Sequence, residues 1–282
     1  MAQGDLATLA DVRAWVSVQD TSSDALLSRL ISSVSSMVRA HTSRTCFARQ
    51  SVVEVRDGTG TESLVLREWP VVSVSQVTVG RRVVPQSPGP DQWGWVLSPY
   101  LGAPPGDPQI VRLRGCQSFC LGSQNVSVSY DAGYVVSGEP TTVASVGGLV
   151  PVFQVRAPLG PWIADEGVVR ADSGAPLQLV SGTPGLGQYS LPTPAFGEQP
   201  GQYQFSLADV GAPLLVSYSY VPSDLEQVVV EMVGERFAYR GRIGQRSKSL
   251  GGQETVSFSG AAMPEWAQMA LRPYVSVLLV PS

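Results

Sequence analysis

When a central segment is removed, the two remaining pieces of the sequence predict one continuous fold. Residues 131–134 (Asp-Ala-Gly-Tyr) close a strand and residues 221–227 (Val-Pro-Ser-Asp-Leu-Glu-Gln) open a helix, and joining them gives strand, turn and helix start without a break. Insertion into a surface turn needs such a site, because the two ends of the inserted piece must lie side by side. The sequence therefore predicts a host domain in two pieces, 1–134 and 221–282, and an inserted β-rich domain, 135–220.

Composition limits the class of protein. Of the 282 residues, 43% are hydrophobic and 15% are charged, which is enough apolar material for roughly two domains of about 150 residues each. The formal net charge is −4. Proteins that coat nucleic acid carry an excess of Lys and Arg, so we do not expect this chain to wrap a polyanion.

Two helices are expected near the start of the host. The first, over 8–18, has Thr8 as its cap, with Asp11 in the place of the usual Glu of a capping box. The second, over 23–43, repeats apolar residues at helical spacing and carries serines and charges on its other face. Its apolar stripe consists of Leu26, Leu27, Leu30, Ile31, Val34, Met37 and Val38.

The host returns to helix after the insert. A capping box of Ser223 and Glu226 opens a helix expected over 223–241. A glycine-rich stretch, 247–260, follows, and because it has little apolar surface to offset the entropy of fixing it, we expect it to order only on assembly. A last short helix is expected between Pro264 and Pro273.

The remaining segments alternate apolar and polar residues, as strands do. A β region is expected over 51–130, and six short strands separated by Gly, Pro and Asp are expected in the insert. The predicted fold class is α+β: a helical bundle with a β region as the host domain, plus an inserted all-β sandwich-like domain.

Few residues are suited to catalysis or to holding a cofactor. The three cysteines, Cys46, Cys116 and Cys120, lack zinc-ligand neighbours, and we expect the last two to be partly buried apolar groups. The single histidine, His41, falls near the end of the second helix. The adjacent carboxylates Asp165 and Glu166 are expected in a turn, poorly placed to share one substrate. We therefore expect no enzyme activity, no cofactor and no metal.

No segment has the pattern of a membrane anchor. The start lacks a cationic and then apolar leader, and the late apolar run 275–280 is far shorter than the ~20 residues that span a bilayer. We expect a soluble protein made in the cytoplasm.

The host pieces resemble the head–tail adaptor (connector) family of tailed bacteriophages. The first piece carries the resemblance in 9–16 (LADVRAWV), 24–27 (DALL) with the helix running to 42–44 (TSR), and 66–71 (LREWPV). The second piece carries it in 222–227 (PSDLEQ), 240–244 (RGRIG), 251–255 (GGQET), 263–264 (MP) and 271–274 (LRPY). The insert departs from the compact family pattern, although 164–168, 187–190, 203–206 and 208–209 look like a β module that recurs in phage virion proteins.

The resemblance implies a structural virion protein of the viral neck, made in the host bacterial cytoplasm. Its subunits would form a homo-oligomeric ring, twelve in the family, between the portal protein and the next stopper or tail-completion protein. DNA would pass through the channel during genome ejection without specific binding. In such a ring each subunit meets its neighbour through two different patches.

Candidate partner contacts lie after the third helix. The apolar tail beyond Pro273 gains stability chiefly by burial, either against a partner or by folding back as an edge strand. A basic cluster consists of Arg236, Arg240, Arg242, Arg246 and Lys248. It either complements the helix dipole, contacts carboxylates of a neighbouring subunit or contacts phosphates of DNA in the channel, and the subunit contact is our prediction. The residues expected to contact partners are Arg240, Arg242, Arg246, Trp266, Tyr274 and Leu278.

Two alternative functions stay open from the sequence. One is a binding module in which the insert recognises a glycan or host surface, with Trp162, Tyr189 and Tyr203 as an aromatic platform. The other is a hydrolase whose site has no recognised motif.

Overall fold

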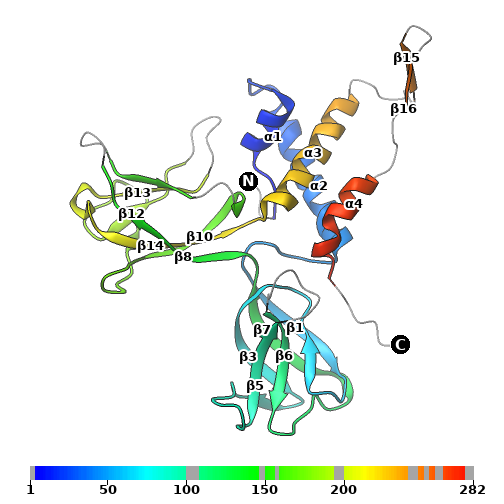
Figure 1. Ribbon diagram of the computed structural model, residues 1–282, viewed down its shortest axis with the longest axis vertical. Coiled ribbons are helices and arrows are strands. Elements are labelled where there is room, and N and C mark those ends of the chain that lie inside the picture. Colours follow the sequence, from blue (N-terminus) through cyan, green and yellow to red (C-terminus); the bar gives the residue numbers. More distant parts are fainter. Residues whose placement is uncertain are drawn as a thin grey trace.

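The chain folds into three lobes, shown in the computed structural model of Figure 1. The structure describes residues 4–99, 108–145, 150–155, 159–193, 200–240, 247–250, 254–257 and 263–276. We call the lobes the helical lobe (α1 to α4), the β lobe (β1 to β7) and the insert (β8 to β14). Each lobe has its own cluster of buried apolar side chains.

The predicted fold class is wrong in its balance. Strands hold 38% of the structure and helices 26%, so the host is not a helical bundle with a small β region. The segment expected to accompany the helices instead buries a core of its own, between two sheets. Alternation along a strand predicts one buried face but does not tell which element covers it. For this reason the sequence did not separate the β lobe from the helices.

The helical lobe comprises four helices from both ends of the chain. They are α1 (Leu9–Val16), α2 (Asp24–Thr42), α3 (Ser223–Tyr239) and α4 (Glu265–Leu271). Thr8 caps α1 as predicted, accepting a hydrogen bond from the Asp11 amide. The predicted capping box of α3 is wrong, because Pro222 is the N-cap and makes no side-chain bond.

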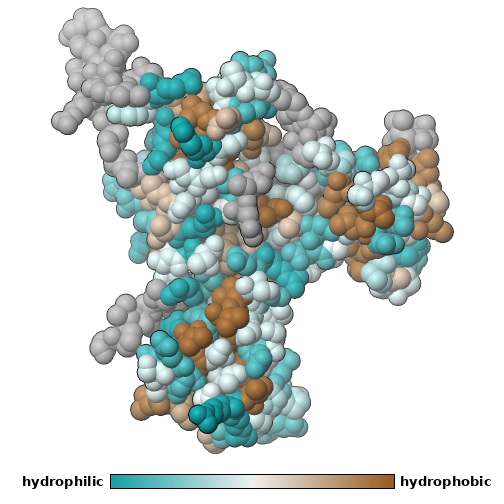
Figure 2. Space-filling model, turned by 180° about the vertical axis from the view of Figure 1, so that it is seen from behind, coloured by the Kyte–Doolittle hydropathy of each residue, from teal (hydrophilic) through white to brown (hydrophobic). Residues whose placement is uncertain are grey.

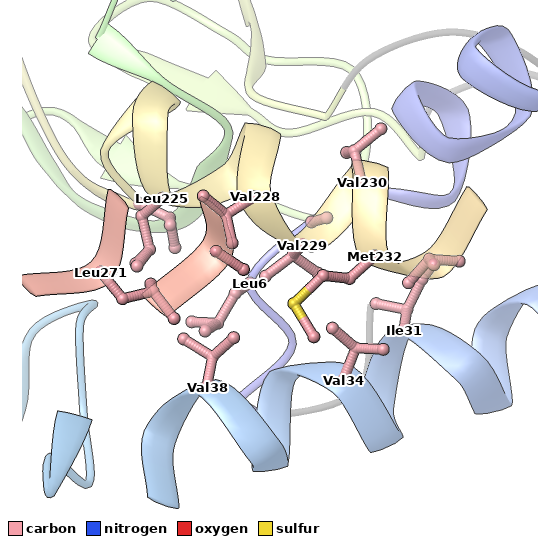
Figure 3. Close-up of a cluster of buried hydrophobic side chains, with 14 of the residues drawn as sticks. Leu6, Ile31, Val34, Val38, Leu225, Val228, Val229, Val230, Met232 and Leu271 are labelled. Carbon is pink, nitrogen blue, oxygen red and sulfur yellow. The ribbon is translucent and has the colours of Figure 1, made fainter. Parts of the chain in front are cut away.

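The four helices share one core (Figure 3). Side chains of α2 meet those of α3, and α4 closes the end of the cluster. Burial of each such aliphatic side chain contributes about 1.5–3 kcal/mol. The buried members labelled in Figure 3 are Leu6, Ile31, Val34, Val38, Leu225, Val228, Val229, Val230, Met232 and Leu271.

The β lobe packs two antiparallel sheets against each other. One sheet has the order β1-β7-β3-β4 and the other β2-β6-β5. The strands are β1 (Gln50–Gly58), β2 (Ser63–Val65), β3 (Val71–Val79), β4 (Arg82–Val84), β5 (Gly94–Pro99), β6 (Pro108–Arg114) and β7 (Gly122–Ala132). On β7 the residues Val126, Val128 and Tyr130 alternate inward, as period two requires.

The insert also packs two sheets around a core. One has the order β10-β14-β8, the other β11-β12-β13-β9, and β11 pairs with β12 in parallel. The strands are β8 (Val135–Thr142), β9 (Val152–Gln154), β10 (Trp162–Arg170), β11 (Gln178–Leu179), β12 (Gln188–Ser190), β13 (Gln202–Phe205) and β14 (Pro213–Tyr220), with a short 3-10 helix, η3 (Leu207–Asp209), before β14.

The two ends of the insert are adjacent. The Tyr220 amide donates to the Tyr134 carbonyl at 3.1 Å, and the two rings lie 5.9 Å apart. Immediately before this point the backbone of Gly133, at φ 136°, passes so close to Ala48 that a Cβ would lie 2.4 Å from its carbonyl carbon. Only glycine fits this crossing.

After α3 the structure describes a small hairpin. β15 (Ser247–Leu250) pairs antiparallel with β16 (Glu254–Ser257), within the stretch expected to be irregular. A lone two-stranded hairpin is marginally stable in water. Its ordering on assembly therefore stays a prediction, which hydrogen exchange on free and assembled protein would test.

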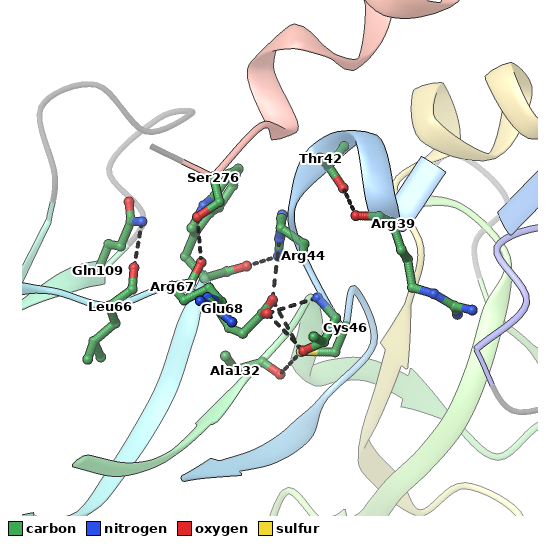
Figure 4. Close-up of polar contacts among 12 residues, drawn as sticks. Arg39, Thr42, Arg44, Cys46, Leu66, Arg67, Glu68, Gln109, Ala132 and Ser276 are labelled. Carbon is green, nitrogen blue, oxygen red and sulfur yellow. Dashed lines mark hydrogen bonds and ion pairs between the residues drawn. The ribbon is translucent and has the colours of Figure 1, made fainter. Parts of the chain in front are cut away.

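A buried cation joins the helical lobe to the β lobe (Figure 4). Arg44, just after α2, is fully buried, and its Nε lies 3.7 Å from an Oε2 of the equally buried Glu68. Its guanidinium lies 4.1 Å from the ring centroid of Trp69 and 4.4 Å from that of Phe47, and it donates to the Trp69 carbonyl. Glu68 also accepts from the backbone amide and hydroxyl of Thr45, both at 2.8 Å.

Breaking the buried Arg44–Glu68 ion pair would strongly destabilise the fold. A desolvated cation–π contact contributes about 2 kcal/mol, and removing one partner of a buried ion pair costs about 3–5 kcal/mol because the other charge stays buried. Within the described part of the chain, two guanidinium nitrogens of Arg44, Nε and Nη1, have no hydrogen-bond partner. The aromatic rings therefore provide most of the cation's surroundings.

We expect Arg44→Met to lower the free energy of unfolding by about 3–5 kcal/mol, since it leaves Glu68 charged and buried. The double variant Arg44→Met/Glu68→Gln should lose less than Arg44→Met alone, because no buried charge is left unpaired. Urea unfolding followed by tryptophan fluorescence measures both. The exposed neighbour Arg67→Met is the control, expected within about 0.5 kcal/mol of the parent. A double variant no better than the single one would contradict the ion-pair account.

Candidate interaction surfaces

The residues predicted to contact partners fall in different environments. Arg240 is exposed at the end of α3, with its guanidinium 4.4 Å from the ring centroid of its own Phe237. Trp266 on α4 is half-buried against the helical core. The other predicted contacts, Arg242, Arg246 and Leu278, lie outside the described residues.

Tyr274 is held inside its own chain. Only 7% of it is exposed, its ring stacks on Trp69 at a centroid distance of 6.4 Å, and its hydroxyl donates to Asp224 at 2.6 Å. Burial raises the pKa of this phenol above its usual range, and the Asp224 carboxylate adds to the shift. Two residues later the Ser276 amide donates to the Thr42 carbonyl at 2.8 Å. The segment after α4 is therefore held by contacts within its own chain, against Trp69 of the β lobe and the last turn of α2.

Arg49 bridges the β lobe and the insert. Its Nη2 lies 2.9 Å from Asp131 on β7 and its Nη1 lies 2.8 Å from Glu166 on β10. Hydrogen bonds from Ser51 and then from Arg49 lower the pKa of Asp131, so the bridge is charged at neutral pH. Partly exposed pairs of this kind are worth about 0.2–1 kcal/mol each, so the bridge orients the insert more than it stabilises the fold.

The two adjacent carboxylates of the insert, Asp165 and Glu166, contact different parts of the protein. Both lie on β10, so the predicted turn is wrong, and a bulge between Asp165 and Gly167 separates their directions. Glu166 meets Arg49, whereas Asp165 faces the core and accepts from the hydroxyls of Tyr189 at 2.5 Å and Tyr203 at 3.1 Å. They do not converge on one substrate.

The predicted aromatic platform is not on the surface. Tyr203 is fully buried and Tyr189 is 3% exposed, with their ring centroids 6.0 Å apart. The half-buried Trp162 donates its Nε1 to the Tyr203 hydroxyl at 3.1 Å. The rings of Tyr189 and Tyr203 lie in the insert core, so they cannot stack against a sugar, and the predicted three-ring platform is not formed.

The cysteines differ from the prediction. Cys116 and Cys120 are exposed, whereas Cys46 is buried and its thiol donates to Glu68 at 3.7 Å. Burial raises the pKa of Cys46 to about 12, with the Glu68 charge adding to the shift. Cys46 lines a cavity of about 320 Å3 where the three lobes meet. Its thiol is protonated at neutral pH, so it is no nucleophile there.

A carboxyl pair that the sequence did not reveal lies between α1 and α3. Glu226 does not cap its helix but meets Asp11 of α1, beside the half-exposed ring of Trp15. Burial raises the pKa of Glu226 to about 9, and the hydrogen bond with Asp11 adds to the shift. Glu226 is therefore protonated at neutral pH. Its position in an apparent capping box concealed this role.

This pair predicts how the helical lobe responds to pH. The pKa of Glu226 is raised from 4.5 to about 9 in the folded state, so its stabilising effect is complete below pH 4.5 and is lost as pH rises toward 9. The urea midpoint, followed by tryptophan fluorescence, should therefore fall across that window. Glu226→Gln, which mimics the protonated acid, should remove most of the fall. The exposed Glu235→Gln on the same helix is the control, and an unchanged slope in Glu226→Gln would reject the assignment.

Large apolar side chains are exposed on each lobe. On the helical lobe they are Trp15 at 52%, Tyr239 at 46% and Met269 at 67%. Brown surface also gathers over the insert in Figure 2. The exposed large apolar residues of the insert are Val150, Val152, Leu179, Leu186, Leu207 and Val210. Exposed apolar groups of this kind mark contact surfaces when they cluster.

Comparisons with known proteins do not assign a family, since neither a protein-family model nor any curated protein matches this sequence. Among the helices that the structure describes, none has the length and apolar character needed to cross a membrane. Within the same described residues, no group of three or more His, Cys, Asp or Glu side chains is arranged to hold a metal ion.

Proposed function

We propose that this chain is a subunit of a head–tail adaptor ring in a tailed-bacteriophage virion. The ring lies between the portal protein and the next stopper or tail-completion protein, and its channel lets DNA pass without specific binding. The proposal rests on the resemblance of the two host pieces to that family.

The observation that supports the proposal most is the shared core of the helical lobe. Apart from 66–71, the motifs of the resemblance lie before the β lobe or after the insert, yet Val38 of α2, Leu225 of α3 and Leu271 of α4 pack in one cluster. Had α3 and α4 formed a separate body, the two halves of the resemblance would not describe one domain. Because these helices share one core, the two pieces of sequence that carry the resemblance belong to a single folded unit.

Exposed apolar groups on this unit offer ring contacts. Trp15, Tyr239 and Met269 come from three helices, and aromatic residues and methionine are enriched where subunits meet. The exposed Arg240 lies one residue beyond Tyr239 and supplies a charge-assisted partner for a carboxylate of the next subunit. Of the other members of the predicted basic cluster, Arg236 on α3 donates to the Met37 sulfur at 3.2 Å and Lys248 lies on β15. Arg242 and Arg246 lie outside the described residues.

Electron microscopy tests the proposal directly. The purified full chain, or the chain mixed with its portal protein, should form closed rings. A chain that stays monomeric under both conditions would contradict the adaptor function.

A pair of variants tests the helical contact. Met269→Asp should weaken ring formation, because it places a charge in an apolar interface and an aspartate must then be desolvated. Leu121→Asp, at an 80% exposed position of the β lobe, is the matched control and should form rings as the parent does. Native mass spectrometry counts the subunits. Equal assembly of the two variants would remove Met269 from the interface.

A further inference from the structure

One face of the insert carries five side-chain amides. Along β12 and β13 the residues Tyr189, Tyr203 and Phe205 point into the core, so the glutamines beside them point to the other side of the sheet, where Gln204 pairs with the exposed Val152 and with Ser190, which is 6% exposed. Register places Gln202 opposite Gln154 and Gln178 opposite Gln188. We call this the amide face, formed by Gln154, Gln178, Gln188, Gln202 and Gln204.

The amides at the centre of this face are available for bonding. Among the described residues, nothing hydrogen-bonds the side chains of Gln202 and Gln204, which are half-buried. By contrast Gln154 donates to the Pro200 carbonyl at 3.0 Å. A side-chain amide offers two donors and an oxygen acceptor, so the free pair presents unused hydrogen-bonding capacity.

The opposite face of the insert is largely apolar and has small side chains at its centre. On β14 the residues Leu214, Val216 and Tyr218 face the core, so Leu215 and Ser217 face outward. Register places Pro140 and Val169 beside Leu215, and places Gly167 beside Ser217. We call this the flat face, formed by Pro140, Thr142, Gly167, Val169, Pro213, Leu215 and Ser217.

Neither face carries an unpaired charge. The described charged side chains of the insert are engaged within the protein: Glu139 with Tyr218, Asp165 with Tyr189 and Tyr203, Glu166 with Arg49, Arg170 with Asp172, and Asp209 with Arg170 and the Gly187 amide. Charged residues normally make up about 25–35% of a soluble surface. Depletion of charge is instead a property of interface centres.

We infer that inserts of neighbouring copies of this chain stack side by side, with the amide face of one copy against the flat face of the next. The inference rests on the proposed ring. A closed ring needs two different patches on each subunit, and the two faces differ and lie on opposite sides of one sandwich. Copies of one chain carry the same net charge of −4, so uncharged faces are where they approach with least repulsion.

The chemistry of the two faces favours a protein occupant over a sugar. The Ser217 hydroxyl accepts from the Gly138 amide at 3.0 Å and keeps its own proton to donate to an amide oxygen. A glycan site of comparable size would expose an aromatic ring for stacking, and the insert's rings Tyr189 and Tyr203 are buried. A glycan is therefore an outcome of the test and not the expected occupant.

A charge-swap experiment on the full chain tests this contact. Gln204→Lys on the amide face and Leu215→Glu on the flat face should each weaken self-association about tenfold or more, since each buries an unpaired charge. The double variant Gln204→Lys/Leu215→Glu should return toward the parent affinity, because the two charges then face each other across every contact. Sedimentation velocity over a concentration series measures all three.

Two further variants keep the result interpretable. Thr142→Glu, at an exposed position of the flat face, replaces Leu215→Glu if thermal melting shows that the half-buried Leu215 site does not tolerate a charge. Gln76→Lys, on the exposed surface of β3 in the β lobe, is the matched control and should associate as the parent does.

Several outcomes would overturn the inference. They are a parent that is monomeric throughout the series, single variants that associate like the parent, or a double variant weaker than both single ones. Glycan-array binding lost in Gln204→Lys, with a monomeric parent, would assign the amide face to a sugar. Portal-bound rings that persist in every variant would reject the stacking but leave the adaptor function standing, whereas the charge-swap pattern without rings would support stacking and reject that function.

Discussion

The arrangement of the lobes depends on one buried cation. Arg44 follows α2 directly, and its guanidinium is enclosed by Phe47, Trp69 and the carboxylate of Glu68. An arginine without water is tolerated only where rings and an opposite charge replace its hydration. Helix α2, the start of the β lobe and the segment before β3 must therefore meet at this point in one geometry.

The features readable from sequence were those with a strong local cause. The stripe on α2 and the cap at Thr8 were predicted because helical spacing and a single hydroxyl determine them. The balance of the fold was not, since β1 to β7 alternate in the same way whether their core is shared or separate. The burial of Cys46 between α2 and β1 likewise depends on contacts with Glu68, from a distant part of the sequence.

In the candidate surfaces, too, some features could be predicted from the local sequence and others depend on contacts with distant residues. The alternating glutamines of β13 are visible in the sequence, but the pairing of Gln202 with Gln154, and of Gln188 on β12 with Gln178, depends on strand register that no local pattern specifies. Tyr274 was predicted as a partner contact because an aromatic residue near a terminus lacks an evident local neighbour. The Asp224 carboxylate that binds its hydroxyl belongs to α3, fifty positions earlier.

The adjacent ends of the insert have a mechanical consequence. Because the Tyr220 amide bonds to the Tyr134 carbonyl and Arg49 joins β7 to β10, a pull from β7 to α3 meets these contacts before it stretches the strands between them. A second path between the β lobe and the helices runs through Arg44 and Tyr274. The strands of the insert would therefore stay paired while the contacts at its base carry the load.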